Sequence, residues 1–340
     1  MSHPDHRTSG SFPDCPDTSR RGFMKTTAAG LALLAATGTA RSLLAADEAK
    51  GGDSETLVAQ LHKSLTEPQK KAVCFAFDHP LRSRVENNWN ITKPTVADFY
   101  TKDQQALIRD IFNSLHSEEY AKRVYAQVDH DSEDIGGFGA SSIALFGEPG
   151  QKFEFVFTGR HVTRRCDGNS VEGAAFGGPI FYGHAAKSFS EKADHAENIY
   201  WYQGLRANEV FKALDGKQRE KSLRTDSRPE QGTATVKLAG KTGAMHGVPM
   251  TDLSKDQKDL VRNVMADVLA PFRKTDADEA MKLVEADGGF DLLHMAFYKN
   301  MDIGNDGVWD VWQLEGPDMF WYFRGHPHVH CWAHIRQPRA

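Results

Sequence analysis

Two groups of short apolar runs, separated by turn-forming residues, constrain the fold of this chain most strongly. The first group lies within residues 142–176 and includes Asp167-Gly168, a dipeptide that favours hairpin turns. The second lies within residues 292–335 and is divided by turns rich in Gly and Pro. Strands are expected at residues 142–146, 153–157, 161–166, 292–298, 308–314, 319–323 and 329–335. Because short turns connect these strands, each group predicts an antiparallel meander.

Helices are predicted around these strands by a recurring capping sequence. In four segments a Thr, Ser or Asp is followed three residues later by Gln. The first side chain can accept a hydrogen bond from the Gln backbone N–H, while the Gln side chain accepts one from the N–H of the cap. The caps are Thr66, Thr101, Asp215 and Ser254. Apolar residues then recur at helical spacing, which is typical of amphipathic helices.

Together these elements predict an α+β fold in which antiparallel sheet meanders are covered by amphipathic helices. The caps form two pairs roughly 150 residues apart, which is compatible with a duplicated helical unit, although the residues between them do not visibly repeat. We expect a single α+β domain over residues 63–340. A flexible linker and the lead-in to the first helix are expected over residues 47–62.

The composition is that of an ordinary globular protein, with 40% apolar residues. Its 46 acidic and 41 basic residues give a net charge of −5, and the Lys and Arg residues are scattered. Nucleic acid is therefore not expected as a partner. The four cysteines include no CxxC pair, which argues against a disulfide framework or a cysteine-rich zinc module.

Residues 1–46 resemble a twin-arginine export signal. Arg20-Arg21 precedes an apolar run of small residues at 28–40 and a cleavage region near Ala46. The run is shorter than the roughly 20 apolar residues that span a bilayer, and Thr37-Gly38-Thr39 interrupts it. We predict recognition by the twin-arginine translocase, a periplasmic location and no membrane span in the mature chain. Because this route carries folded proteins, a metal or cofactor could be loaded before export.

The stretch from Gly325 to Ile335 carries the most informative pattern of the mature chain. Side chains alternate between the two faces of a strand, so His328, His330, Trp332 and His334 are expected on one face. The opposite, apolar face would be directed to the core and would include Cys331 as a small core residue. Neighbours on one face are about 6.5 to 7 Å apart, so His328 and His330 can bind one metal ion together.

A metal ion needs a further ligand from elsewhere in the chain. His161, at the start of another predicted strand, is the best placed residue for this role. His161, His328 and His330 are therefore the candidate ligands of a transition metal such as Zn, Cu or Fe. The same pattern is also compatible with a solvated edge strand, or with structural histidines that hydrogen-bond carbonyl groups.

Two other stretches carry side chains that could take part in a functional site. The acidic run from Asp129 to Asp134 could coordinate a hard cation, but a charge run beside Gly136-Gly137 is more often a solvated loop. The aromatic run Phe320–Phe323 could line a pocket beside the histidines, although the core of a sheet is the commoner environment. Spacing alone assembles no Ser-His-Asp or Cys-His triad.

Several segments together with the export signal resemble the exported bacterial family catalogued as domain of unknown function 3500. They are Phe77-Asp78 to Asn88-Trp89, Leu145-Phe146-Gly147-Glu148-Pro149, Gly159-Arg160-His161-Val162, the turn Pro179-Ile180-Phe181-Tyr182-Gly183, Glu315-Gly316-Pro317 and His328-Val329-His330-Cys331-Trp332. The resemblance covers nearly the whole mature chain. It implies a shared architecture and histidine arrangement, without a reaction.

The chain departs from the pattern of that family at two positions. The resemblance implies Gly-His-His in relatives where this chain has Gly159-Arg160-His161, and an acidic residue near the position of Tyr322. If either residue is a ligand in relatives, the resemblance implies that Arg160 and Tyr322 mark an altered site here.

Three classes of function are compatible with the sequence. The first is a metal-dependent periplasmic enzyme of oxidase, oxygenase or hydrolase type, with a coordination position open to water or to a small-molecule substrate. The second is a non-catalytic envelope protein that binds a metal or a small ligand. The third is a structural domain without a site. Metal content separates the third class from the others, and turnover separates the first from the second.

Overall fold

The computed structural model describes residues 54–184, 198–226, 228–286, 288–301, 307–325 and 327–337. The predicted export signal, including Arg20-Arg21 and Ala46, and the first part of the predicted linker lie outside the described residues. Residues 54–62 of the predicted linker and lead-in belong to helix α2, which spans Ser54–Ser64. The first residue of this helix is buried. Among the described helices, none has the length and apolar character needed to cross a membrane.

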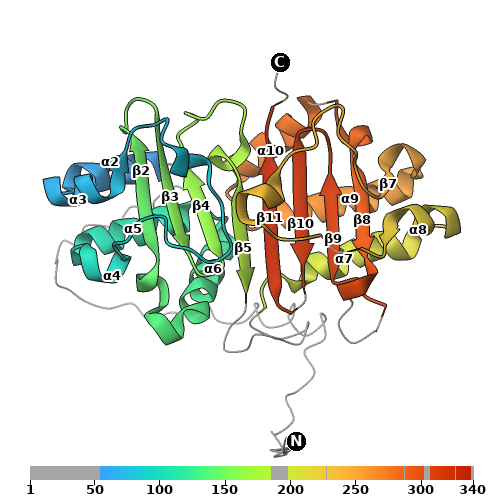
Figure 1. Cartoon of the computed structure of the whole chain (residues 1–340), viewed down its shortest axis with the longest axis horizontal. Coiled ribbons are helices and arrows are strands. Elements are labelled where there is room, and N and C mark those ends of the chain that lie inside the picture. The colour runs from blue at the N-terminus through green and yellow to red at the C-terminus, as the bar shows by residue number, and fades with distance from the viewer. Residues whose placement is uncertain are drawn as a thin grey trace, which may run out of the picture. The chain divides into compact units, whose positions relative to one another are not determined.

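A single 11-stranded sheet organises the described residues (Figure 1). Its order is β1-β2-β3-β4-β5-β11-β10-β9-β8-β6, with β7 paired to β8. The strands are β1 (Cys74–Phe75), β2 (Ser142–Gly147), β3 (Phe153–Gly159), β4 (Val162–Cys166), β5 (Ile180–His184), β6 (Leu223–Arg224), β7 (Val248–Pro249), β8 (His294–Tyr298), β9 (Val311–Glu315), β10 (Met319–Arg324) and β11 (Val329–Ile335). All pairs are antiparallel except β1 with β2 and β6 with β8. The predicted α+β class and both meanders are confirmed.

Amphipathic helices cover one face of this sheet (Figure 1). Besides α2, they are α3 (Glu67–Val73), α4 (Val96–Phe99), α5 (Lys102–Ser114), α6 (Glu118–Asp131), α7 (Trp201–Ala213), α8 (Gly216–Ser222), α9 (Lys255–Leu269) and α10 (Lys274–Ala286). Helices α3, α5, α8 and α9 begin at the predicted caps. In each, the cap side chain and the Gln three residues later form both bonds of a capping box. The capping prediction is confirmed at all four positions.

The capping glutamines also bind one another in two pairs. Gln69 Nε2 donates to Gln104 Oε1 at 2.9 Å, and Gln104 Nε2 donates to Gln69 Oε1 at 3.1 Å. Gln218 and Gln257 exchange the same bonds at 3.0 and 2.8 Å. Each glutamine Nε2 also donates a second hydrogen bond to a backbone carbonyl oxygen. This carbonyl belongs to the residue two positions before the helix cap of the other glutamine in the pair. Each pair therefore fixes two helix starts against each other through satisfied amide groups.

The two halves of the sheet repeat one order of elements. In the first half, capped helix α3 leads into edge strand β1, and capped helix α5 precedes the meander β2 to β5. In the second half, α8 leads into edge strand β6, and α9 precedes the meander β8 to β11. The last strands of the two meanders, β5 and β11, pair antiparallel at the centre. The halves are thus related by an approximate two-fold axis, and the repeat extends beyond the helices that the cap spacing indicated.

The central strand β5 corrects one feature of the sequence analysis. Residues 179–183 are named above as a turn, among the segments that carry the family resemblance. Instead, β5 runs from Ile180 to His184 between β4 and β11. Pro179 stands just before the strand, where its missing N–H does not interrupt the ladder. Pairing on both sides, together with the strand propensity of Ile180, Phe181 and Tyr182, makes this segment a strand.

The two faces of β11 have different surroundings. Its odd-numbered residues Val329, Cys331, Ala333 and Ile335 lie in the cluster formed with the helices. Trp332 lies in a second apolar cluster on the opposite face. The predicted alternation, and the prediction that Cys331 is a core residue, are therefore confirmed. The aromatic run in β10 is likewise buried in the two clusters.

Two loop segments cover the face of the sheet that carries no helices. We call residues 76–95 strap 1, and residues 225–226 with 228–247 strap 2. Strap 1 packs on the first meander and strap 2 mainly on the second. The straps meet over the central strands, where the Val85 N–H donates to Thr233 Oγ1 at 3.0 Å and Thr233 Oγ1 donates to the Val85 carbonyl at 3.2 Å. Each strap follows the edge strand of its own half, as the repeat requires.

Replacing a capping side chain tests the helix starts. We expect Thr101→Ala to lower the free energy of unfolding by about 1 kcal/mol, because the N–H of Gln104 loses its acceptor. Urea unfolding followed by circular dichroism measures the change. The exposed Thr251, which caps no helix, supplies the matched control Thr251→Ala. Equal stability of the Thr101 variant and the wild type would contradict a contribution of the cap.

Candidate metal centre

Three histidines from two parts of the sheet converge at one end of the central strands. His161 lies immediately before β4, while His328 precedes β11 and His330 lies within it. One ring nitrogen from each lies within 4.8 Å of the corresponding atoms of the other two. The three residues are almost inaccessible, with 7%, 5% and 4% of their surface exposed. The structure brings the three predicted residues together, and the face that carries them is covered rather than solvated.

His161 occupies a two-residue hairpin turn with Arg160 between β3 and β4. Its φ of 54° is in the left-handed region, which is uncommon for a residue with a side chain. Two backbone hydrogen bonds hold this conformation: the His161 N–H donates to the Asn87 carbonyl of strap 1 at 2.9 Å, and the Gly183 N–H donates to the His161 carbonyl at 3.0 Å. Such conformations concentrate at functional sites, where the surrounding structure enforces them.

Gly183 in β5 lies beside the cluster. It pairs with His330 of β11 and lies on the same face of the sheet. A Cβ atom at this position would collide with the Val329 carbonyl, whereas its distance of 3.5 Å from the Cβ of His161 would be an ordinary contact. The absence of a side chain therefore allows the backbone of β11 to approach β5 closely at the point where the histidines meet.

Two carboxylates, the buried Asp131 and the largely buried Glu230, orient two of the rings. His161 Nδ1 donates to Asp131 Oδ2 at 3.0 Å, and His330 Nδ1 donates to Glu230 Oε2 at 2.6 Å. An ionised carboxylate only accepts hydrogen bonds, so Nδ1 is the protonated nitrogen in both rings. The Nε2 atoms keep their lone pairs for a ligand bond. His330 Nε2 lies 2.9 Å from His328 Nε2, so these two nitrogens face each other.

The carboxylates come from elements remote in sequence. Asp131 is the last residue of α6 and also accepts from His184 Nδ1 at 2.9 Å. Glu230 belongs to strap 2 and forms an ion pair of 2.8 Å with Arg324. Carboxylates that fix the second nitrogen of a ligating imidazole are a recurrent feature of metal sites.

Burial and neighbouring charges set the protonation of these groups. Burial lowers the pKa of His330 well below its ordinary value, and Arg324 adds to this effect. The ring is therefore neutral near pH 7, the form that binds a metal. Burial raises the pKa of Asp131, but hydrogen bonds from His161 and His184 outweigh it and hold the pKa below the usual value. Burial raises the pKa of Glu230 against the opposing charge of Arg324.

The nitrogen positions are close to those of a metal-bound set. Nitrogens bound to one ion at about 2.1 Å in a tetrahedral arrangement lie roughly 3.4 Å apart. Small rotations of the rings would bring nitrogens that now lie within 4.8 Å to that spacing. An all-imidazole set suits Zn and Cu, whereas non-haem Fe(II) is commonly held by two histidines and a carboxylate.

Neither carboxylate was predicted from the sequence. Asp131 was expected in a solvated acidic loop, but it ends a helix and is only 3% exposed. A signal was present, because Val124, Gln127, Val128 and Asp131 follow helical spacing and form the buried stripe of α6. Glu230 lies in a strap without periodic structure, and nothing local distinguishes it from a surface residue.

The remaining residues singled out by sequence do not join the cluster. Arg160 points to the exposed Asp134, with an Nη1–Oδ1 distance of 3.0 Å. Tyr322 is fully buried on β10, where it pairs with Trp332. His334 lies four residues beyond His330 on the same strand, and its Nδ1 donates to the Val236 carbonyl at 3.1 Å. Cys74, Cys166 and Cys331 are free thiols.

Comparison with known proteins identifies the family. The profile described as "Protein of unknown function (DUF3500)" matches residues 49–340, so the chain belongs to this family. No curated protein and no solved structure matches the chain. The family membership that the sequence segments indicated is confirmed.

Neutralising either carboxylate tests its role in orienting a ligand. We expect Asp131→Asn and Glu230→Gln each to weaken metal binding by about 10- to 100-fold, because an amide can no longer anchor the Nδ1–H as an anion does. Competition with a chromophoric chelator measures the affinity. Asp134→Asn is the matched control, since Asp134 is exposed and bonded to Arg160. Unchanged affinity in both variants would contradict the assigned role.

Proposed function

We propose that this member of the DUF3500 family is an exported enzyme whose active site is a transition metal held by His161, His328 and His330. One observation carries the proposal: three buried imidazoles place ring nitrogens within 4.8 Å of one another. The carboxylates of Asp131 and Glu230 hold two of these rings in the tautomer that leaves Nε2 available. Histidines on the surface or in an ordinary core have no need for converging ring nitrogens or for carboxylates that hold the rings.

The number of ligands favours a catalytic site over a structural one. Structural zinc sites have four protein ligands, whereas catalytic sites commonly have three and leave a position for water or substrate. The described residues supply three. A metal ion in such a position acts as a Lewis acid on water or substrate, or as a redox centre. The reaction is therefore of hydrolase, oxidase or oxygenase type, on a small-molecule substrate.

Location in the periplasm is the second part of the proposal. The support for it is the sequence from Arg20-Arg21 to Ala46, which has the order of parts of a twin-arginine signal. Export in the folded state suits a metal site built from residues of both halves of the sheet, since this site exists only after folding.

Removing single ligands tests the metal centre. Purified wild-type protein should contain roughly one transition-metal ion per chain by elemental analysis. His161→Ala, His328→Ala and His330→Ala should each lose most of this metal, because two imidazoles no longer enclose the ion. Circular dichroism and the unfolding transition establish that the variants fold.

The control is His334→Ala, which removes an imidazole from the same strand and face outside the cluster. It should retain the metal. If the wild-type protein still contains no metal after incubation with Zn, Cu and Fe, the proposed metal centre is contradicted. Stoichiometric metal without turnover in hydrolase and oxidase screens would instead favour the non-catalytic binding protein.

Replacing both arginines of the signal tests the route of export. Arg20→Lys with Arg21→Lys should abolish export, because the paired arginines distinguish this signal from others. Fractionation of periplasm and cytoplasm, followed by immunoblotting, measures the distribution. A single Arg7→Lys replacement serves as the control. Normal export of the double variant would contradict the assignment.

A further inference from the structure

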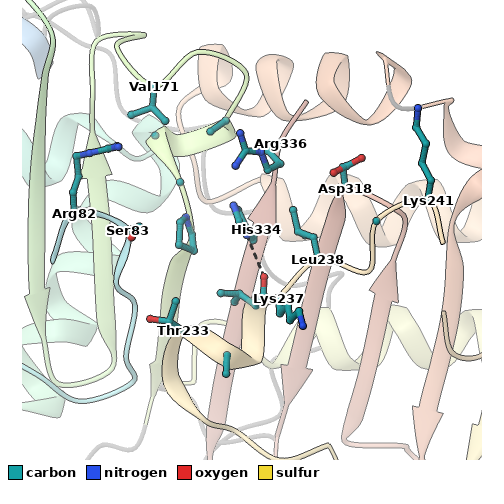
Figure 2. A pocket seen from close by; sticks show the side chains of 17 residues that line it. Arg82, Ser83, Val171, Thr233, Lys237, Leu238, Lys241, Asp318, His334 and Arg336 are labelled. Carbon is teal, nitrogen blue, oxygen red and sulfur yellow. Dashed lines mark hydrogen bonds between the residues drawn. The ribbon is translucent and has the colours of Figure 1, made fainter. Parts of the chain in front are cut away.

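A cleft lies on the same face of the sheet as the metal centre, at the other end of the central strands (Figure 2). It has a volume of about 820 Å³ and opens between strap 1 and strap 2. Its floor includes His334 near the end of β11 and Pro179 before β5. We call it the strap cleft. Its size is in the range of pockets that hold small molecules.

Basic side chains surround the strap cleft. Arg82 borders it on one side, and Lys237, Lys241 and Arg336 border it on the other (Figure 2). Asp318 is the one acidic residue among the side chains that line it. Arg82 is paired with the buried Glu154 at 3.0 Å, whereas no ion pair joins Lys237 or Lys241 to another residue in the described parts of the chain. The net field in the cleft is therefore positive.

The remainder of the lining is apolar. Val171, Val236 and Leu238 contribute aliphatic surface, as do Pro179 and several alanines and glycines. A hydrated inorganic ion would gain no favourable contact with this aliphatic surface. The lining holds four basic residues and one acidic residue, and Arg82 is already paired with Glu154, so the cleft suits a molecule with one or two negative charges better than a polyphosphate. The lining thus matches an organic anion with an apolar body.

The repeat of the fold gives an independent reason to regard the strap cleft as a binding site. The metal centre combines a hairpin turn before β4, the end of β5 and the start of β11. The strap cleft combines the turn before β10, the end of β11 and the start of β5. Each turn is bonded to a strap: the His161 N–H donates to Asn87 O at 2.9 Å, and the Gly240 N–H donates to Pro317 O at 2.7 Å. The two sites therefore occupy equivalent positions about the approximate two-fold axis.

We infer that the strap cleft binds a small organic carboxylate, with the basic rim that includes Lys237 and Lys241 attracting the carboxylate and the aliphatic floor receiving the apolar body. This site is separate from the metal centre. His334 lies four residues along β11 from His330, about 13 Å at the usual rise per residue. Phe181 and Trp332, both buried, fill the intervening part of that face.

Calorimetric titration with benzoate and octanoate tests the inference, with benzyl alcohol and octanol as neutral analogues. The acids should bind saturably, and the alcohols should bind at least about tenfold more weakly, because a charge-assisted bond is lost. Lys237→Gln with Lys241→Gln should weaken acid binding by about tenfold or more. Ala234→Trp, which places a bulky ring in the exposed lining, should block both acids. Raising the salt concentration should also weaken binding.

The matched control is Lys217→Gln with Lys255→Gln, which removes two exposed lysines remote from the cleft and should bind as the wild type does. Protein stripped of metal with a chelator should bind the acids equally well, so failure of the metal centre leaves this result unaffected. The inference is overturned if neither acid binds, if the alcohols bind as tightly, or if the Lys237 and Lys241 variant retains full affinity. Binding that disappears with the metal would place the anion on the metal centre and would equally overturn it.

Discussion

The antiparallel pairing of β5 with β11 is the interaction on which both candidate sites depend. It joins the two meanders into one sheet through the register from Val329 opposite His184 to Ala333 opposite Ile180. It also brings the turn that carries His161 next to the strand that carries His330, because β4 and β11 lie on either side of β5. Without this pairing each half would hold only part of the ligand set.

Features determined by neighbours in sequence could be predicted well. The capping boxes at Thr66 and Ser254 depend on residues three apart, and the alternation along β11 depends on strand geometry alone. β5 was not predicted as a strand, because Pro179 and Gly183 favour a turn, although Ile180, Phe181 and Tyr182 between them favour a strand. Its conformation is decided by hydrogen bonds to β4 and β11, which are close in space but distant in sequence from one another.

The candidate site likewise has a part that local sequence predicts and a part that depends on tertiary contacts. Strand parity was sufficient to place His328 and His330 together, and the need for a further ligand drew attention to His161. Strand parity and the number of ligands could not predict the two carboxylates. Asp131 reaches His161 only because α6 packs on the sheet near the end of β5, and Glu230 reaches His330 only because strap 2 folds back over β11. Contacts of this kind are properties of the assembled fold.

The two carboxylates beside the histidines would favour a cation at this point. Glu230 forms an ion pair with Arg324, and Asp131 accepts hydrogen bonds from His161 and His184. A carboxylate that is removed from water needs hydrogen bonds or a positive charge to compensate the lost hydration. A divalent cation on the Nε2 side would polarise the His161 ring and strengthen its bond to Asp131. Because such an ion binds only the folded arrangement, its binding free energy would add to the stability of the fold and would offset the strained backbone at His161.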